Sequence, residues 1–190
     1  STLPELTKQV ITQFPDLHLI LQEVTPATLV DAVLEAKYDV GLVFNPGPVR
    51  LLQCLTLHRE NLCLAVNETH SLADEKKVGV DRLKNEPIIA TPHSVAPVLR
   101  DMIDLYLRQG GIEPYYRLET QLQQTIISLV AEGIGVAIVP ESVKKLHYAG
   151  VKYLELEQSP AIEQVIIWHQ DNSNPALNSF TRLARAIAER

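Results

Sequence analysis

The chain has 190 residues, of which 46% are hydrophobic, so it can form one domain or two small ones and can bury a substantial core. Its formal net charge is −6 and it contains no basic block, which makes the chain alone a poor ligand for nucleic acid. No apolar run is long enough to span a membrane, and the first residues lack the charged-then-apolar pattern of a signal peptide, so we expect a cytoplasmic chain with no membrane partner.

Residue types that carry catalysis or bind metals do not fall into known patterns. Cys54 and Cys63 form an isolated pair, so we expect reduced thiols and no disulfide framework. The six histidines show no metal-ligand spacing, and the chain has neither a P-loop nor a G-x-S-x-G elbow. His93 and Ser94 are adjacent, and neighbouring side chains rarely point together. We therefore expect no metal, no cofactor and no catalytic residues, and a protein that is not an enzyme.

Helical and strand-like patterns alternate from the start of the chain. Apolar spacing predicts a helix over residues 3–14, and the alternating "DLHLILQE" predicts a strand after it. The run "TPATLVDAVLEAKYD" predicts a second helix, with Thr25 as its N-cap and Pro26 in its first turn. The apolar "DVGLVF" predicts a buried strand.

The same alternation continues to the end of the chain. Residues 51–57 and 62–66 predict two strands, and the polar residues 67–77 predict a surface loop. The other predicted elements are a strand in "EPIIAT", a helix over 95–109, a strand over 115–119, a helix over 121–132, a strand over 136–139, strands over 151–156 and 162–168, and a helix over 175–188. Strands that alternate with helices predict an α/β fold with largely parallel sheets, in two linked subdomains.

Two glycines interrupt the stretch "SLVAEGIGVAIVP". A dinucleotide-binding fingerprint requires a strand, then glycines, then a helix, whereas here a helical run precedes the glycines and a strand follows them. Gly133 fits the position after a helix, where a positive φ is favourable for glycine. We expect Gly135 to allow a tight turn into the strand and Pro140 to end that strand before a short helix.

Hydroxyl and amide side chains gather at three predicted strand-to-helix junctions. These junctions are "EVTPAT" with Thr25 and Thr28, "ATPHSVAP" with Thr91, His93 and Ser94, and "LETQLQQ" with Thr120 and Gln121. Unpaired N–H groups and the helix dipole make each junction a possible anion site. Ser and Thr also cap helices that bind nothing, so simple capping stays open as an alternative.

Four segments resemble the effector-binding domain of LysR-type transcriptional regulators. They are "LPELTKQVITQFPDLHLILQE", "LVDAVLEAKYDVGLVF", "LTLHRENLCLAVNETHSLA" and "ISLVAEGIGVAIVP", in the family's order. The resemblance implies a type II periplasmic-binding-protein-like fold: two Rossmann-like α/β subdomains around an interdomain cleft, joined by two crossover strands, "LCLAV" and "VIIWH". It implies a first subdomain of residues 1–66 plus 165–190 and a second of residues 67–164.

The resemblance also implies a function. The chain is expected to bind a small organic anion, such as a carboxylate, in the cleft, and so to modulate DNA binding and transcription by the full-length protein. It is expected to form homodimers, and tetramers at full length, with the helices over 3–14 and 95–109 as candidate contacts. DNA and RNA polymerase are expected partners only of the full-length protein. The expected effector-binding residues are Thr25, Pro26, Thr28, Thr91, Pro92, His93, Ser94, Gln121 and Gly133.

The chain departs from the family pattern in two places. The family's N-terminal helix-turn-helix is absent from this sequence, so we expect an excised domain. The family's first strand normally lies just before the "LPEL" helix, and the sequence starts without it, so we expect either that the protein has further residues there or that this sheet is incomplete. The alternative function is a solute-binding receptor of a transport system with the same fold. An upstream helix-turn-helix in the gene product would favour the regulator, and an upstream signal peptide would favour the receptor.

Overall fold

The computed structural model describes residues 2–189 and divides into two compact units. Unit 1 comprises Ser1–Arg59 with Glu163–Arg190, and unit 2 comprises Glu60–Ile162. Both boundaries fall inside strands, β2 (Leu52–Asn67) and β8 (Ala161–His169), which therefore contribute residues to both units.

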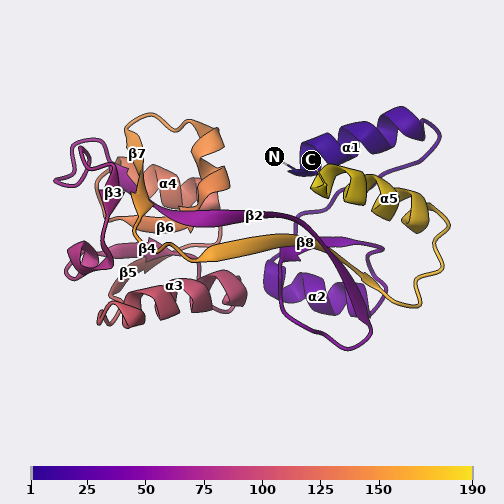
Figure 1. Ribbon diagram of the computed structural model, residues 1–190, viewed down its shortest axis with the longest axis horizontal. Helices are drawn as coiled ribbons and strands as arrows, with labels where there is room; N and C mark the ends of the chain where they lie inside the picture. The colour runs from indigo at the N-terminus through magenta and orange to yellow at the C-terminus, as the bar shows by residue number, and fades with distance from the viewer. Residues whose placement is uncertain (1, 190) are drawn as a thin grey trace. The chain divides into compact units, whose positions relative to one another are not determined.

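Unit 1 contains three helices, α1 (Thr2–Gln13), α2 (Pro26–Leu34) and α5 (Ala176–Ala188). Helix α1 packs on α5, as Figure 1 shows. Their apolar faces meet in one cluster, in which Leu6 and Val10 are buried with Leu183 and Ala184. The helices predicted over residues 3–14 and 175–188 are confirmed, because their apolar residues recur at the helical spacing that makes one buried face.

The sheet of unit 1 is formed by β1 (Gly41–Phe44), β8 and β2. Strand β1 pairs antiparallel with β8, with Gly41 opposite Ile167. Val33 of α2 packs against Val43 and Val165 and covers this part of the sheet. The predicted strand "DVGLVF" is confirmed.

One predicted strand is wrong. The segment "DLHLILQE" is extended but makes no strand ladder among residues 2–189. Leu17 and Leu19 pack against the α1–α5 cluster, whereas Ile20 and Leu21 are exposed. Alternating side chains therefore anchor one side of the segment, but a strand also needs a neighbouring backbone to receive its hydrogen bonds.

Strand β2 is a single strand of 16 residues, although the sequence predicts two. Its polar stretch His58–Arg59–Glu60–Asn61 contains neither glycine nor proline, so nothing in it breaks the extended backbone. In unit 2, β2 pairs antiparallel with β6 (Ala137–Pro140) and with β7 (Val151–Leu156). The expectation of largely parallel sheets is therefore wrong for β1–β8, β2–β6 and β2–β7, because the long strands that belong to both units pair in antiparallel fashion.

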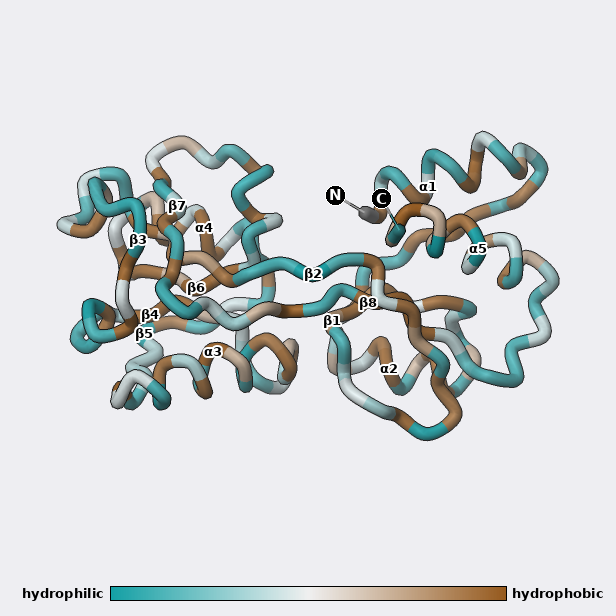
Figure 2. Tube along the Cα trace, in the orientation of Figure 1, coloured by the Kyte–Doolittle hydropathy of each residue, from teal (hydrophilic) through white to brown (hydrophobic). Residues whose placement is uncertain are grey.

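The remaining elements of unit 2 follow the predicted order. They are β3 (Lys77–Val78), the 3-10 helix η1 (Val80–Leu83), β4 (Ile88–Ala90), α3 (Pro97–Gln109), β5 (Tyr116–Glu119), α4 (Gln123–Ala131) and the 3-10 helix η2 (Glu141–Leu146). Strands β3 and β7 pair in parallel, as do β4 and β5. Ile126, Ile127 and Val130 of α4 pack on Cys63 and Ile89. Figure 2 shows β6 as an apolar strand in this core.

The glycine pair after α4 has two different structural roles. Gly133 has φ +71°, which confirms that it ends the helix in the left-handed region. Gly135 does not have a positive φ, and a Cβ there would lie 2.3 Å from the carbonyl oxygen of Pro87. Close approach of the Pro87 backbone, and not a tight turn, is therefore what requires glycine at position 135. The N–H of Val136 donates to that same carbonyl at 2.9 Å.

Within residues 2–189, no helix combines the length and the apolar character needed to cross a membrane.

Candidate functional site

The ends of β4 and β5 meet at one edge of the sheet in unit 2. The two strands are parallel neighbours, and the N–H of Thr120 donates to the carbonyl of Ala90 at 3.0 Å. Thr91 follows β4 and Gln121 follows β5, so the structure brings these two predicted residues to the same edge. Ligands of α/β sheets bind at such carboxyl ends of strands.

Helix α4 begins at this edge without a side-chain cap. Its N-cap residue is Leu122, whose apolar side chain has no acceptor, and no side-chain hydrogen bond caps the helix. Gln121 is exposed and precedes the N-cap, because the helix begins at Gln123 and not at 121 as predicted. The first N–H groups of α4 are therefore available to an anion, and the helix dipole favours one there.

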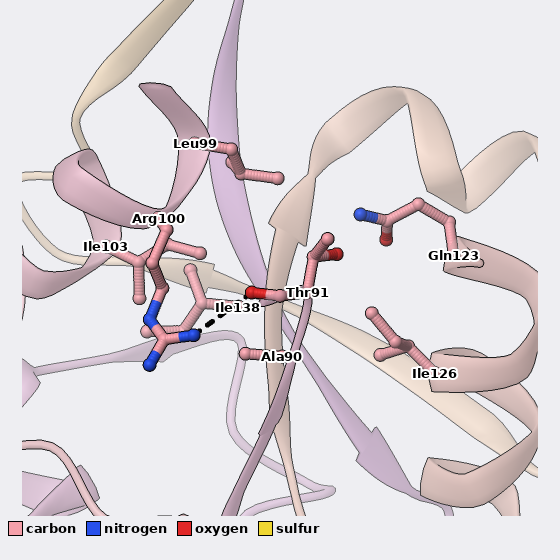
Figure 3. Close-up of a pocket in the computed structure, with 8 residues that line it drawn as sticks. All are labelled: Ala90, Thr91, Leu99, Arg100, Ile103, Gln123, Ile126 and Ile138. Carbon is pink, nitrogen blue, oxygen red and sulfur yellow. Dashed lines mark hydrogen bonds between the residues drawn. The ribbon is translucent and has the colours of Figure 1, made fainter. Parts of the chain in front are cut away.

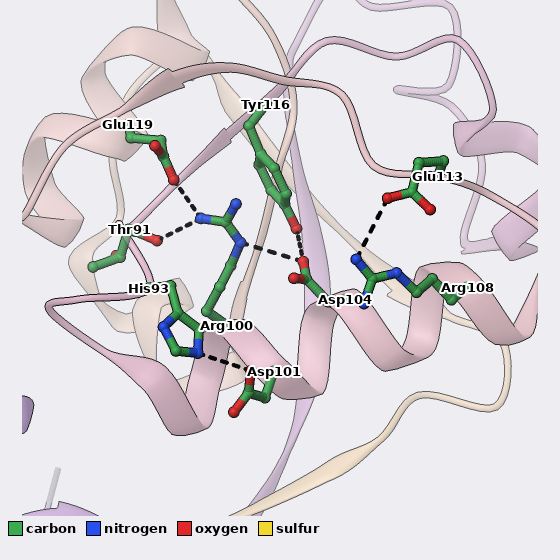
Figure 4. Close-up of polar contacts among 9 residues, drawn as sticks. All are labelled: Thr91, His93, Arg100, Asp101, Asp104, Arg108, Glu113, Tyr116 and Glu119. Atoms are coloured by element: carbon green, nitrogen blue, oxygen red, sulfur yellow. Dashed lines mark hydrogen bonds and ion pairs between the residues drawn. The ribbon is translucent and has the colours of Figure 1, made fainter.

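The loop between β4 and α3 carries four of the predicted residues. Thr91 is buried, Pro92 is half-buried, and His93 and Ser94 are exposed. Helix α3 begins at Pro97, two residues later than predicted, and Ala96 is its N-cap residue, so Ser94 does not cap it. His93 is held by a contact of 3.0 Å between its Nε2 and Oδ1 of Asp101 (Figure 4).

Arg100 is a central residue of this region that the sequence analysis missed. It lies on α3, is 8% exposed, and donates from Nη1 to the backbone carbonyl of Thr91 at 3.0 Å. It also donates to Glu119 at 2.5 Å and to Asp104 at 3.2 Å. Its guanidinium carbon lies 3.3 Å from the centre of the Tyr116 ring (Figure 4). Arg100 therefore ties the end of β4 to α3 and to β5.

The single positive charge of Arg100 is paired with two carboxylates, Asp104 and Glu119. Burial lowers the pKa of Arg100, but hydrogen bonds to Glu119 and Tyr116 and the charge of Asp104 raise it overall, so the guanidinium stays charged. Burial and the hydrogen bond to Asp104 raise the pKa of Tyr116, which stays neutral. Because two carboxylates already engage Arg100, it serves to position Thr91. Its sequence signal was a charge inside an apolar helical face, next to Leu99 and Ile103.

A small cavity lies between α3, α4 and the end of β4. It is lined by Ala90, Thr91, Leu99, Arg100, Ile103, Gln123, Ile126 and Ile138 (Figure 3). Gln123, the first residue of α4, is a second site residue that the sequence analysis missed. The neighbouring glutamines in "QLQQ" have the same polarity, so no local pattern indicates that this one points inward.

The predicted residues of unit 1 lie at the start of α2. Thr25 occupies the N-cap position but makes no side-chain cap hydrogen bond. Its hydroxyl lies 2.9 Å from the hydroxyl of Thr28, which also donates to the carbonyl of Thr25 at 3.0 Å. Pro26 is the first residue of the helix. The two hydroxyls thus bond to each other and leave the first N–H groups of α2 without a side-chain partner.

Gly133 is separated from the other predicted residues of unit 2. It follows the C-terminal end of α4, whereas Gln121 precedes the N-terminal end, and nine helical residues span about 13 Å. Its N–H donates to the carbonyl of Val130 at 2.9 Å. The structure gives Gly133 the role of ending the helix.

In the described part of the chain, no group of three or more His, Cys, Asp or Glu side chains is arranged to hold a metal ion.

The chain matches known proteins over almost its whole length. The model of the family described as LysR substrate binding domain matches residues 1–188. The HTH-type transcriptional regulator IlvR of Caulobacter vibrioides is 30% identical over 186 residues, which cover 96% of this chain and 62% of that protein. The HTH-type transcriptional regulator AlsR of Bacillus subtilis is 28% identical over 183 residues, covering 96% and 61%. The chain thus spans about three fifths of these curated relatives.

Solved structures share the fold. The effector binding domain of QuiR in complex with shikimate has a TM-score of 0.86 at 19% identity and covers 99% of this chain and 90% of that one. The effector binding domain of BenM with benzoate has a TM-score of 0.84 at 21% identity, covering 100% and 86%. Full-length CbnR with its target DNA has a TM-score of 0.87 at 21% identity, covering 99% and 66%. These matches do not favour a transport receptor, and the chain belongs to the LysR substrate-binding domain family, with its type II periplasmic-binding-protein-like fold.

Proposed function

We propose that this chain senses a small organic anion for a LysR-type transcriptional regulator, and that the anion binds in unit 2 where β4 and β5 end. The observation that carries the proposal is the junction itself. Two parallel strands end side by side there, and the uncapped N-terminus of α4 lies at the same edge. Backbone N–H groups without partners, together with the helix dipole, attract a carboxylate.

Exposed polar side chains at this edge add direct contacts. Ser94 and Gln121 are both exposed and follow the two strand ends. Hydrogen bonds from such groups to a charged carboxylate are each worth roughly 1.5–3 kcal/mol. Thr91, Pro92 and His93 shape the loop that carries Ser94. In unit 1, Thr25, Pro26 and Thr28 are separate candidate contacts at the uncapped start of α2.

The full-length protein is proposed to bind DNA in the cytoplasm and to respond to the anion by a population shift. The response can be no larger than the difference in the anion's affinity for the two states. We propose that the chain binds and does not catalyse, and that it self-associates through α1 or α3, to dimers and, at full length, to tetramers. Sedimentation at micromolar concentration tests this: strictly monomeric behaviour contradicts self-association.

Calorimetry with a panel of metabolic carboxylates tests the binding site. We expect Ser94→Ala and Gln121→Ala each to weaken binding at least tenfold without unfolding the chain, because both side chains are exposed. Ser179→Ala on α5 in unit 1 is the matched control and should bind as the unmodified chain does. Unchanged affinity in the Ser94, Gln121 and Thr25 alanine variants means that the proposed site is wrong.

A gel-shift assay tests whether this chain binds DNA by itself. We expect no sequence-specific DNA binding by these 190 residues, because the chain carries a net charge of −6. Specific and salt-sensitive retardation of DNA would contradict this expectation.

A further inference from the structure

Three buried side-chain polar atoms of unit 2 have no hydrogen-bond partner among the described residues. One is the hydroxyl of Tyr153, and the other two, Oγ1 of Thr91 and Oε1 of Gln123, belong to residues that line one cavity. Figure 3 shows the Thr91 hydroxyl and the Gln123 amide facing one another across the cavity. Thr91 is 8% exposed. Buried polar groups in folded proteins are almost always hydrogen-bonded, so we expect a molecule in the cavity that forms hydrogen bonds with both atoms.

The chemistry of the lining restricts what the occupant can be. Apart from Thr91, Gln123 and Arg100, the lining is apolar: Ala90, Leu99, Ile103, Ile126 and Ile138. Arg100 is already paired with Glu119 and Asp104 and bonds to the carbonyl of Thr91, so a charged group in the cavity would find no free counter-charge among the lining residues. A neutral hydroxyl fits both atoms, because it donates to Oε1 of Gln123 and accepts from the hydroxyl of Thr91.

The size of the cavity agrees with a single oxygen. Its volume is about 10 Å³, which is close to the room that one water molecule needs. A methyl-bearing branch or a ring is too large, whereas the oxygen of a hydroxyl fits. A water molecule is therefore the expected occupant when no ligand is bound, and a ligand hydroxyl can replace it while keeping both of its hydrogen bonds.

Gln123 connects this cavity to the proposed anion site. It is the first residue of α4, so its backbone N–H belongs to the uncapped start of the helix while its side-chain oxygen lies in the cavity. A ligand with a carboxylate on the helix N-terminus and a hydroxyl in the cavity would therefore contact both ends of Gln123. Short acids with the hydroxyl on the first or second carbon after the carboxylate are the simplest ligands of this kind.

We propose that the effector is a hydroxy acid, whose carboxylate lies at the start of α4 and whose hydroxyl lies between Thr91 and Gln123. This inference rests on the proposed function, since it assigns a ligand class to the same edge of unit 2. It goes beyond that function because it predicts a preference between carboxylates that differ by one oxygen. A site with buried polar groups rejects an analogue that lacks the matching hydroxyl, because those groups are then left unpaired.

The test is calorimetry of the whole chain with three matched pairs: lactate and propionate, malate and succinate, and 3-hydroxybutyrate and butyrate. In at least one pair the hydroxy acid should bind at least tenfold more tightly. Thr91→Val and Gln123→Met keep the side-chain volume but remove the polar atoms, so both should reduce the ratio to about one. Binding of the unsubstituted acid should stay within twofold, because the backbone N–H groups remain.

Two control variants separate this role from a structural one. Thr91→Ser keeps the hydroxyl and should retain the preference for the hydroxy acid. Gln109→Met makes the same exchange as Gln123→Met at an exposed position at the end of α3, and it should retain the preference as well. Thr91→Val should melt close to the unmodified chain, because the hydroxyl has no protein partner and its loss removes only a hydrogen bond to the water in the cavity. If Thr91→Val unfolds, Gln123→Met alone decides the outcome.

The outcomes distinguish the two proposals. Equal binding within every pair, with the carboxylates still bound, overturns the hydroxy-acid assignment and leaves the anion site standing with a water in the cavity. Failure of all six acids to bind overturns both proposals. A preference that persists in both Thr91→Val and Gln123→Met places the hydroxyl elsewhere and overturns the inference.

Discussion

Nη1 of Arg100 donates to the backbone carbonyl of Thr91 at 3.0 Å, which fixes the residue that follows β4 to the first turn of α3. The same guanidinium engages Glu119 at the end of β5, so one side chain sets the spacing of the two strand ends. Because Arg100 holds Thr91, which lines the cavity beside Gln123, Arg100 positions the proposed site.

Replacing Arg100 should destabilise the chain strongly. Arg100→Leu keeps much of the volume but leaves Asp104 and Glu119 without their cation, and breaking a buried pair costs about 3–5 kcal/mol. We expect the free energy of unfolding to fall by about 3 kcal/mol, because Glu119 is 43% exposed and water can solvate its carboxylate once the arginine is gone. Urea denaturation followed by circular dichroism measures the effect. Arg108→Leu on the same helix breaks only an exposed pair with Glu113 and should change stability by less than about 0.5 kcal/mol. Equal losses of unfolding free energy in Arg100→Leu and Arg108→Leu would show that the Arg100 network does not stabilise the fold.

The two glycines after α4 should differ in their tolerance of alanine. Gly135→Ala forces a Cβ against the Pro87 carbonyl oxygen, where backbone must shift, and such overpacking costs about 2–3 kcal/mol. Gly133→Ala meets no atom within 4 Å but places alanine at φ +71°, which costs about 1 kcal/mol. Gly47→Ala, at φ +78° in open space, is the control for positive φ alone. The same denaturation assay ranks the three variants, and a smaller loss for Gly135→Ala than for Gly133→Ala would contradict the close-approach explanation.

The two cysteines should differ in reactivity. Cys54 is exposed, whereas burial raises the pKa of Cys63 to about 12, so at pH 8 Cys63 is a protonated thiol out of reach of reagents. Ellman's reagent should titrate one thiol per native chain at once and the second only after unfolding. Cys54→Ser should leave no fast-reacting thiol, and rapid reaction in that variant would disprove the burial of Cys63.

The same pKa shift makes stability depend on pH in the alkaline range. The folded state holds the Cys63 proton up to about pH 12, and the unfolded state releases it near the ordinary value of 9.0. This contribution to stability is complete below pH 9 and is lost as pH rises from 9 toward 12, by up to about 1.4 kcal/mol per pH unit. Stability should therefore fall less steeply between pH 9 and 10 in Cys63→Ala than in the unmodified chain, and parallel curves would contradict this.

Thr25→Ala should have little effect on stability. A threonine that caps a helix contributes about 1 kcal/mol, but the hydroxyl of Thr25 bonds to Thr28 and not to a helix N–H. We expect a loss of less than about 0.5 kcal/mol in urea denaturation, and a similar loss for Thr28→Ala because the two hydroxyls bond to each other. A loss of about 1 kcal/mol or more, which is the contribution of a capping threonine, would mean that Thr25 caps α2 in solution. With stability unchanged, any loss of ligand affinity in Thr25→Ala reports binding.

Local patterns in the sequence determined which segments become helices and where α4 ends. Helices α1 and α5 follow from apolar residues at helical spacing, and Gly133 follows from the low cost of a positive φ in glycine. These features depend on residues within a few positions of one another. Strands are less determined, because a ladder needs a partner that is distant in the sequence. The segment "DLHLILQE" alternates as a strand does but has no ladder among residues 2–189, and β2 continues where two strands were predicted.

The candidate site also combines features set by local sequence with features set by tertiary structure. The sequence placed polar side chains after β4 and β5, because a strand-to-helix junction is a local feature. Only the tertiary structure decided that Thr91, Arg100 and Gln123 line one cavity, since they come from a loop and two helices that are brought together by the parallel pairing of β4 with β5. A buried arginine on an apolar helical face is stable only where carboxylates and a carbonyl meet it, and those partners lie 4 to 19 positions away on other turns and strands.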